Sequence, residues 1–178
     1  MDEKVTDQFV FFWNGRFSQW YSSPFTIGSL TYNCAEQWMM YQKACIFGDL
    51  ETAVNILAST SPKEQKAYGR KIQGFNDGVW NLLCIDIVRV GNLAKFTQNP
   101  ELGDYLLETD DLVLVEASPY DKIWGIGMGM TDARVEDPKK WKGLNLLGHV
   151  LNSVRDDLKR NKAADEADMA EASASATH

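Results

Sequence analysis

The sequence predicts a compact, mainly helical α+β domain with a few short strands. Most apolar residues recur at helical spacing, in segments that begin and end at residues typical of helix caps. Only a few short apolar runs are typical of strands, and they do not alternate regularly with the helices, which argues against a doubly wound parallel sheet. A chain of 178 residues indicates one domain that can bury a full core without disulfides or metals.

The first elements are short strands. We expect residues 1–8 to be an N-terminal extension and the apolar run 9–13 to be a strand. The aromatic segment 18–25 is too irregular in polarity for a helix, so it is a loop that either closes as a lid or covers the core. Residues 27–32 then form the second strand of a hairpin, with Gly28-Ser29 at its bend.

Three helices follow, each with a capping signal. Asn33 is the expected N-cap of the first, and Glu36 has the spacing of a capping box, so this helix runs to a stop at Gly48. Asp49 caps the second helix. The segment Ser61-Pro62-Lys63-Glu64 begins the third, with an N-cap, a proline at the first position and a glutamate at the third.

The second half contains a long helix from Trp80 to about Phe96 and a short one that Asn99-Pro100-Glu101 begins and that ends near Leu107. Apolar residues of the long helix recur at steps of four, three and four: Leu83, Ile87, Val90 and Ala94. A final amphipathic helix has its stripe at Leu144, Leu147, Leu151, Val154 and Leu158. The domain is therefore expected to span residues 9–161, followed by a disordered acidic Ala/Ser-rich tail or a frayed helix extension over residues 162–178.

Residues 116–130 are the stretch around which the chain is organised. They follow a buried strand at 112–115, and loops held by a scaffold are where function concentrates. Glu116, Asp121 and Trp124 offer a base, an acid and an aromatic platform; the alternative is a tight structural turn that carries two carboxylates. The alternating glycines of this stretch do not match the dinucleotide-binding fingerprint, because no helix starts after them.

Charge and cysteine content narrow the function classes. The net charge is −7, but the acidic residues are concentrated at the two ends, and no strongly basic surface indicates a nucleic-acid binder. The one basic cluster, residues 139–142, could contact phosphates or be a solvated loop. Three cysteines without metal-site spacing suit a reducing compartment.

Histidine content and hydropathy exclude two further classes. The only histidines are His149 and His178, so neither a histidine-based metal site nor a Ser-His-Asp triad is expected. No segment reaches the ~18 apolar residues of a membrane span, and the N-terminus lacks a signal-peptide core. We therefore expect a soluble, cytoplasmic protein without a membrane partner.

Nine residues carry potential chemistry, although each alone is also compatible with a helix cap, a solvated helix face, an ion pair or core packing. They are Glu36, Lys43, Arg70, Trp80, Lys95, Glu116, Asp121, Trp124 and Asn145.

These residues and their neighbours form an ordered set: Phe17-Ser18-Gln19-Trp20, Ala35-Glu36-Gln37-Trp38-Met39, Lys43, Gly69-Arg70, Trp80, Lys95-Phe96, Leu114-Val115-Glu116, Asp121, Trp124-Gly125, Gly143, Asn145, Leu147-Gly148 and Arg155. The set spans about residues 9–158 and resembles the NADAR family, also called YbiA-like. No single motif is specific, but their order is. The resemblance implies a compact, mainly helical α+β fold.

The resemblance also implies an N-glycosidase that cleaves the bond between a base nitrogen and a ribose carrying phosphate. Some members of the family act on riboflavin-pathway intermediates, and others remove ADP-ribose from modified guanine in nucleic acid. We favour removal of ADP-ribose from guanine in nucleic acid or nucleoside, so the expected partners are an ADP-ribosyl or ribose-phosphate substrate and ADP-ribosylated nucleic acid. The alternatives are a hydrolase of riboflavin-pathway pyrimidine ribose phosphates and a non-catalytic ADP-ribose-binding module.

By this resemblance Glu36, Trp80 and Asp121 are the expected catalytic residues. The expected substrate-binding residues are Ser18, Trp20, Lys43, Arg70, Lys95, Glu116, Trp124, Gly125 and Asn145. Carboxylates can stabilise an oxocarbenium-like ribose and activate water, so no metal or cofactor is expected. Cys84 stands where relatives often have a basic residue, and Gln19 where some have asparagine; the former puts one phosphate contact, and so the substrate subclass, in doubt.

Overall fold

The structure is a computed structural model that describes residues 2–175. Its strands are β1 (Glu3–Val5), β2 (Phe9–Phe12), β3 (Phe25–Ile27), β4 (Leu30–Tyr32) and β5 (Val113–Glu116). Its helices are α1 (Ala35–Ile46), α2 (Leu50–Ala58), α3 (Pro62–Gly69), α4 (Asp77–Gln98), α5 (Pro100–Leu107) and α6 (Leu146–Ser175), with a short 3-10 helix at Pro138–Lys140. The predicted mainly helical α+β class is confirmed. None of the helices within residues 2–175 is long and apolar enough to cross a membrane.

Three strands form a small mixed sheet in the order β1-β2-β5. Strand β1 pairs antiparallel with β2, whereas β2 and β5 run parallel, with Phe12 beside Glu116. The carboxyl ends of β2 and β5 therefore meet at one edge, where the following loops begin. Residues 1–8 are not merely an extension, as predicted, because Glu3–Val5 belongs to the sheet; three edge residues of mixed polarity leave no strand pattern in the sequence.

A hairpin is present with Gly28-Ser29 at its bend, as predicted, and its strands β3 and β4 pair antiparallel with Ile27 opposite Leu30. Residues 27–32 are not one strand, however, because the turn and β4 both lie within them. Gly28 in its bend has φ +63°, a backbone conformation that glycine adopts without a steric penalty.

Helix α1 begins differently from the predicted capping box. Cys34 is the N-cap and makes no side-chain capping bond, and the N–H of Asn33 donates to Oε1 of Gln37 at 2.7 Å. Gln37, three residues after the true cap, therefore occupies the position that reaches back. Glu36 is the second helical residue and is buried, so its carboxyl group is not used in capping.

Other caps agree with the sequence, with one exception. Asp49 and Ser61 accept backbone N–H groups at the starts of α2 and α3, as predicted. Helix α5 begins at Pro100, but the side chain of Asn99 does not cap it; it donates to the carbonyls of Pro24 and Lys95.

Helix α4 starts three residues before the predicted Trp80, because Asn76 caps it by accepting the N–H of Val79 at 3.0 Å. The predicted apolar stripe is also wrong: Leu83 and Val90 are 39% and 43% exposed. The buried residues of this helix are Trp80, Cys84, Val88, Gly91, Asn92, Lys95 and Phe96. Small and polar side chains dominate this face because α1, α5 and α6 contact it closely.

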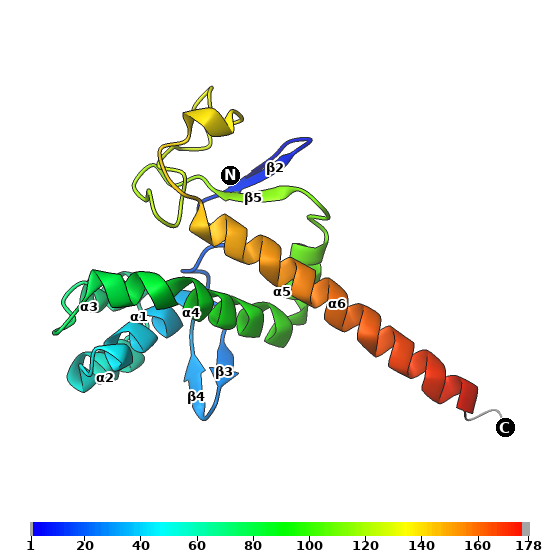
Figure 1. Cartoon of the computed structure of the whole chain (residues 1–178), viewed down its shortest axis with the longest axis horizontal. Coiled ribbons are helices and arrows are strands. Elements are labelled where there is room, and N and C mark those ends of the chain that lie inside the picture. The colour runs from blue at the N-terminus through cyan, green and yellow to red at the C-terminus, as the bar shows by residue number, and fades with distance from the viewer. Residues whose placement is uncertain (1, 176–178) are drawn as a thin grey trace.

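Helix α6 lies between β5 and α4 and continues past the body of the molecule (Figure 1). It begins at Leu146, which leaves Leu144, the first residue of the predicted stripe, outside the helix and exposed. It also stays helical to Ser175, so residues 162–175 form the predicted helical extension and not a disordered tail; residues 176–178 of that prediction lie outside the described residues. The residues after 162 are rich in alanine, the strongest helix former, which extends an existing helix at little cost. Residues 161–172 are exposed.

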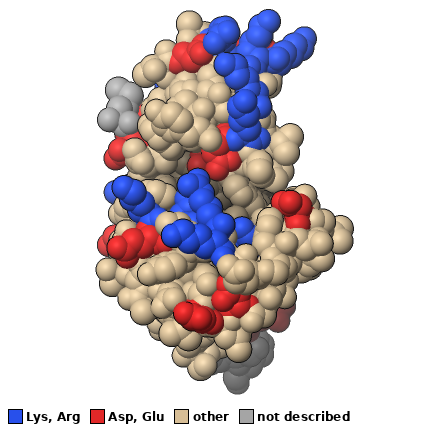
Figure 2. Space-filling model, turned by 90° about the vertical axis from the view of Figure 1, so that its left-hand side faces the viewer, with Lys and Arg blue, Asp and Glu red and all other residues tan. Residues whose placement is uncertain are grey.

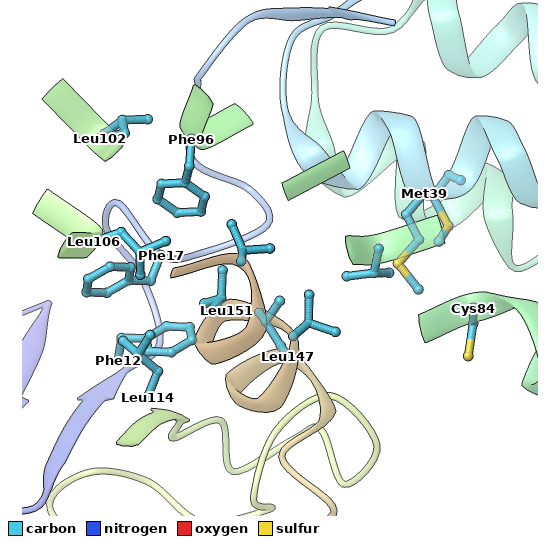
Figure 3. Close-up of a cluster of buried hydrophobic side chains, with 14 of the residues drawn as sticks. Phe12, Phe17, Met39, Cys84, Phe96, Leu102, Leu106, Leu114, Leu147 and Leu151 are labelled. Carbon is cyan, nitrogen blue, oxygen red and sulfur yellow. The ribbon is translucent and has the colours of Figure 1, made fainter. Parts of the chain in front are cut away.

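The main core joins the sheet to the helices beneath it. Figure 3 shows aromatic and aliphatic side chains from β2, β5, α4, α5 and α6 meeting around Phe17. Phe17 stacks on Tyr105 with ring centroids 5.2 Å apart. This contact anchors the loop after β2, whose next residues enter the functional site.

Candidate functional site

A cavity of about 710 Å³ opens between the loops that follow β2 and β5 and the helices α1, α3 and α4. Its lining residues are Trp13, Asn14, Ser18, Gln19, Trp20, Glu36, Met39, Met40, Lys43, Lys66, Gly69, Arg70, Trp80, Glu116, Ser118, Tyr120, Asp121, Lys122, Ile123 and Trp124. On the side of the molecule where α3 lies, Lys and Arg side chains gather on two sides of a hollow, with acidic side chains between them (Figure 2).

Glu36 faces this cavity from the first turn of α1. Its backbone N–H donates to the carbonyl of Gln19 at 2.9 Å, which ties the helix to the loop after β2. Burial raises the pKa of its carboxyl group from 4.5 to about 7. The charge of Lys66, a hydrogen bond from Trp20 and the charge of Arg70 each lower this pKa. The charge of Asp121 raises it further.

Glu116 enters from the opposite wall, at the end of β5. Its Oε2 atom is buried and has no hydrogen-bond partner among the described residues. Burial raises its pKa from 4.5 to about 8; Asp121 and Glu36 add to that effect, and Lys66 opposes it. Two carboxyl groups therefore share the cavity, and the negative charge of Glu36 disfavours ionisation of Glu116.

Asp121 is partly committed to the backbone. Its Oδ1 accepts the N–H groups of Ile123 at 2.9 Å and Trp124 at 2.8 Å, which fixes the turn that presents Trp124. The local turn role that the sequence left open is thus present. The negative charge of Asp121 still acts on Glu36 and Glu116.

The cations lie mainly on the α1 and α3 side. Nζ of Lys43 donates to the carbonyl of Gly69 at 2.9 Å and lies 4.2 Å from the ring centroid of Phe75 and 5.5 Å from that of Trp80. Burial lowers the pKa of Lys43. Arg70 follows α3 directly, and Lys66 lies one turn earlier, 5.9 Å from the ring centroid of Trp20.

Aromatic rings surround the carboxyl groups. The expected Trp20, Trp80 and Trp124 all line the cavity. At the mouth, Trp13 and the 85% exposed Tyr120 add a pair of rings whose centroids are 5.7 Å apart.

Three of the predicted substrate-binding residues, Lys95, Gly125 and Asn145, do not line the cavity. Nζ of Lys95 is buried and donates to the carbonyls of Arg16 at 2.8 Å and Ser18 at 2.9 Å, and burial lowers its pKa to about 7. Lys95 therefore holds the loop that carries Ser18. A side chain at Gly125 would place its Cβ 2.8 Å from the carbonyl oxygen of Glu116, so this glycine permits close packing behind the site.

Asn145 supports the site from the start of α6. Its Oδ1 accepts the N–H of Glu116 at 2.9 Å, and its Nδ2 donates to the carbonyl of Leu114 at 3.0 Å. Its φ of +54° is unusual for a residue other than glycine. This buried amide acts on the strand that presents Glu116.

Several lining residues were not predicted: Trp13, Asn14, Met39, Met40, Lys66, Ser118, Tyr120, Lys122 and Ile123. The sequence did allow a prediction of Lys66, because it precedes Arg70 by four residues and so lies on the same helical face. Trp13 ends an apolar run, which indicated only a strand. Within the described chain, no three His, Cys, Asp or Glu side chains group as a metal site.

Comparison with known proteins places these features in a family. The NADAR domain matches residues 11–159. The chain belongs to the NADAR domain family. It is 40% identical over 165 residues to an N-glycosidase of Acanthamoeba polyphaga mimivirus, covering 85% of this chain and 97% of the relative. It is 33% identical over 121 residues to an N-glycosidase of Nostoc punctiforme, covering 67% of this chain and 70% of the relative.

The solved structure of the Escherichia coli protein YbiA has the same fold, with a TM-score of 0.74, 26% identity and 92% of each chain covered. The predicted family and its mainly helical α+β fold are confirmed. The predicted enzyme class, an N-glycosidase, is also confirmed by the relatives of that name. The substrate is a separate question.

Proposed function

We propose that this NADAR-family N-glycosidase removes ADP-ribose from modified guanine, in nucleic acid or in the free nucleoside. The observation that carries the proposal is the cavity, where Glu36 and Glu116 lie beside indole rings and cations and the charge of Glu36 disfavours ionisation of Glu116. Cleavage of an N-glycosidic bond needs a carboxylate at the ribose, a surface for the base and cations for phosphate.

Each group has a role in this proposal. Glu36, in its ionised form, stabilises the oxocarbenium-like ribose and activates water. Asp121 adds negative charge beside it, and Trp80 forms the wall against which the ribose and base are oriented. Such groups accelerate the reaction because the cavity holds them in place before the charge develops.

The cations support a substrate with phosphate. Arg70 and Lys66 lie on one wall and Lys122 on another, so a diphosphate could be held between two basic groups. The cavity volume lies within the range of sites that bury a whole small ligand. A pure reader of anionic phosphates would gain little from three carboxylates in its pocket, which favours catalysis over binding alone.

The test is cleavage of the N-glycosidic bond. We would incubate the protein separately with ADP-ribosylated guanosine, an oligonucleotide carrying ADP-ribosylated guanine, NAD and a pyrimidine ribose phosphate, and quantify both cleavage products by chromatography. We expect guanosine or unmodified oligonucleotide and free ADP-ribose from the first two. The Glu36→Gln variant controls for contaminating hydrolases. Release from the pyrimidine ribose phosphate alone would reject the guanine substrate and keep the reaction class.

A further inference from the structure

We propose that Glu116, expected from the sequence only to bind substrate, is the general acid of the reaction, and that Asn145 is the residue that positions it. The inference rests on the proposed function and deepens it, because it assigns the proton that the leaving base needs.

Hydrogen bonds hold strand β5 along both of its edges. Its edge opposite β2 is paired by side chains and a loop and not by a fourth strand. Asn152 accepts the N–H of Leu114 at 3.2 Å, and Asn145 bonds both the carbonyl of Leu114 and the N–H of Glu116. The N–H of Ile126 then donates to the carbonyl of Glu116 at 2.9 Å. Both the N–H and the carbonyl group of Glu116 are therefore hydrogen-bonded.

One oxygen of the Glu116 carboxyl group lacks a hydrogen-bond partner within residues 2–175. Glu116 lines the cavity, and its buried Oε2 has no hydrogen-bond partner among the described residues. A buried polar atom without a partner is costly, so it is retained where a ligand supplies the partner. Asp121 differs, because its Oδ1 already accepts two backbone N–H groups.

The surroundings of Glu116 favour its protonated form. Burial is the largest cause of its raised pKa, which is about 8; Asp121 and Glu36 raise it further, and Lys66 lowers it. Glu36 has its pKa raised to about 7. Near neutral pH the pair can therefore hold one proton, with Glu116 as donor and Glu36 as carboxylate, which is the arrangement that acid–base catalysis requires.

The proposed reaction is hydrolysis by one water molecule. The C1′–N bond breaks, its electron pair stays on the base nitrogen, and the proton of Glu116 is transferred to the leaving base. The carboxylate of Glu36 stabilises the ribosyl cation and accepts a proton from water as the water oxygen bonds to C1′. The products are the guanosine or nucleic acid with its guanine unmodified and free ADP-ribose; Glu116 is left ionised and Glu36 protonated, and exchange with solvent restores both.

The first test is the pH dependence of kcat in the wild type and in Glu116→Gln. The wild type should give a bell, rising as Glu36 ionises and falling as Glu116 loses its proton. In Glu116→Gln we expect kcat to fall by ~10² or more and the falling limb to disappear, while ADP-ribose still binds within several-fold. An unchanged falling limb with a near-normal rate would overturn the assignment of the acid.

The second test separates positioning from structure. Asn145→Asp keeps an acceptor for the N–H of Glu116, loses the donor to Leu114 and adds a negative charge, so kcat should fall, KM should change little and the falling limb should move to higher pH. Asn152→Asp, in α6 and against the same strand but bonded only to the N–H of Leu114, is the matched control whose limb should not move. Equal limbs in the two variants, or a normal kcat in Asn145→Asp, would overturn the positioning role.

The outcomes also separate the two proposals. If the wild type removes ADP-ribose from guanine and Glu116→Gln has the same rate and pH profile, the function stands and the acid is another group. If the wild type cleaves none of the four substrates, both proposals fall. If Asn145→Asp does not fold, Glu116→Gln still decides the acid.

Discussion

At the scale of single residues, the chemistry of the site comes from where the backbone places ordinary glutamates. Glu36 is one residue beyond the start of α1, so the capping that its spacing suggested is done by Gln37. Its carboxyl group is consequently free to face the cavity. Glu116 ends a strand whose edge is already paired, and its Oε2 has no hydrogen-bond partner among the described residues.

The first prediction concerns Glu36→Gln and Asp121→Asn. Both changes keep the shape and remove the charge, and asparagine can still accept the two backbone N–H groups that Asp121 binds. Both variants should fold and bind ADP-ribose, yet lose ~10²-fold or more in kcat, since the loss of one such electrostatic group typically costs that much. Steady-state kinetics with circular dichroism as a folding control is the measurement. Near-normal rates in both would reject the catalytic assignment.

The second prediction concerns how the protonation of Glu116 makes the stability of the fold depend on pH. Its pKa is raised from 4.5 to about 8 on folding, so between those pH values the folded state keeps a proton that the unfolded state releases. Stability is thus lost as pH rises through this window, by at most about 1.4 kcal/mol per pH unit. A glutamine side chain does not titrate, so the Tm of Glu116→Gln minus that of the wild type should increase from pH 5 to pH 8. A constant difference would show that this carboxyl group does not titrate there.

At the scale of elements, the sequence predicted most helices but not the faces they bury. Caps such as Asp49 and Ser61 are local, so their spacing is sufficient to predict them. The buried face of α4 is not local, because three other helices contact it. There Gly91 lies beneath Trp38, and a Cβ at this glycine would be 2.2 Å from the indole Cδ1 atom. An apolar stripe could not reveal a contact that depends on a small residue.

The site shows the same division. The residues that line the cavity carry the polar and aromatic groups that the family resemblance names. Lys95 and Asn145 carry similar groups but bond the backbone, and only the tertiary arrangement separates a ligand contact from a support. The sequence therefore predicted which side chains lie at the cavity better than what each one contacts.

The third prediction concerns the end of α6. Residues 161–172 are exposed, whereas Arg155 bonds Thr109 and the carbonyl of Leu112, and Leu158 belongs to the core. Deleting residues 162–178 should leave kcat and Tm nearly unchanged. The matched deletion of residues 155–178 should lower the Tm by several degrees, because it removes core packing and buried hydrogen bonds. A comparable loss in the shorter deletion would show that the exposed helix has a stabilising contact.

At the scale of the whole molecule, the cavity lies where two parts of the fold meet. The parallel pairing of β2 with β5 brings Trp13 and Asn14 to the same edge as Glu116, although these residues are far apart in the sequence. Helices α1, α3 and α4 form the opposite wall. This long-range pairing could not be predicted from the sequence, because a four-residue apolar strand specifies no partner.

A ligand that spans the cavity should bind the folded state and not the unfolded chain, so it should stabilise the whole domain. For ADP-ribose, a hundredfold excess over its dissociation constant is worth ~2.7 kcal/mol. We expect a rise in Tm that grows with ADP-ribose concentration. Lys66→Met and Arg70→Met should reduce this rise, since both cations line the cavity, whereas Lys159→Met, which removes an ion pair to Asp111 on the surface, should not. Differential scanning fluorimetry measures all four proteins together. No rise in Tm at millimolar ADP-ribose would exclude ADP-ribose as the bound product and favour a smaller ribose phosphate. A rise that Lys66→Met and Arg70→Met leave intact would place the phosphates on the opposite wall, beside Lys122.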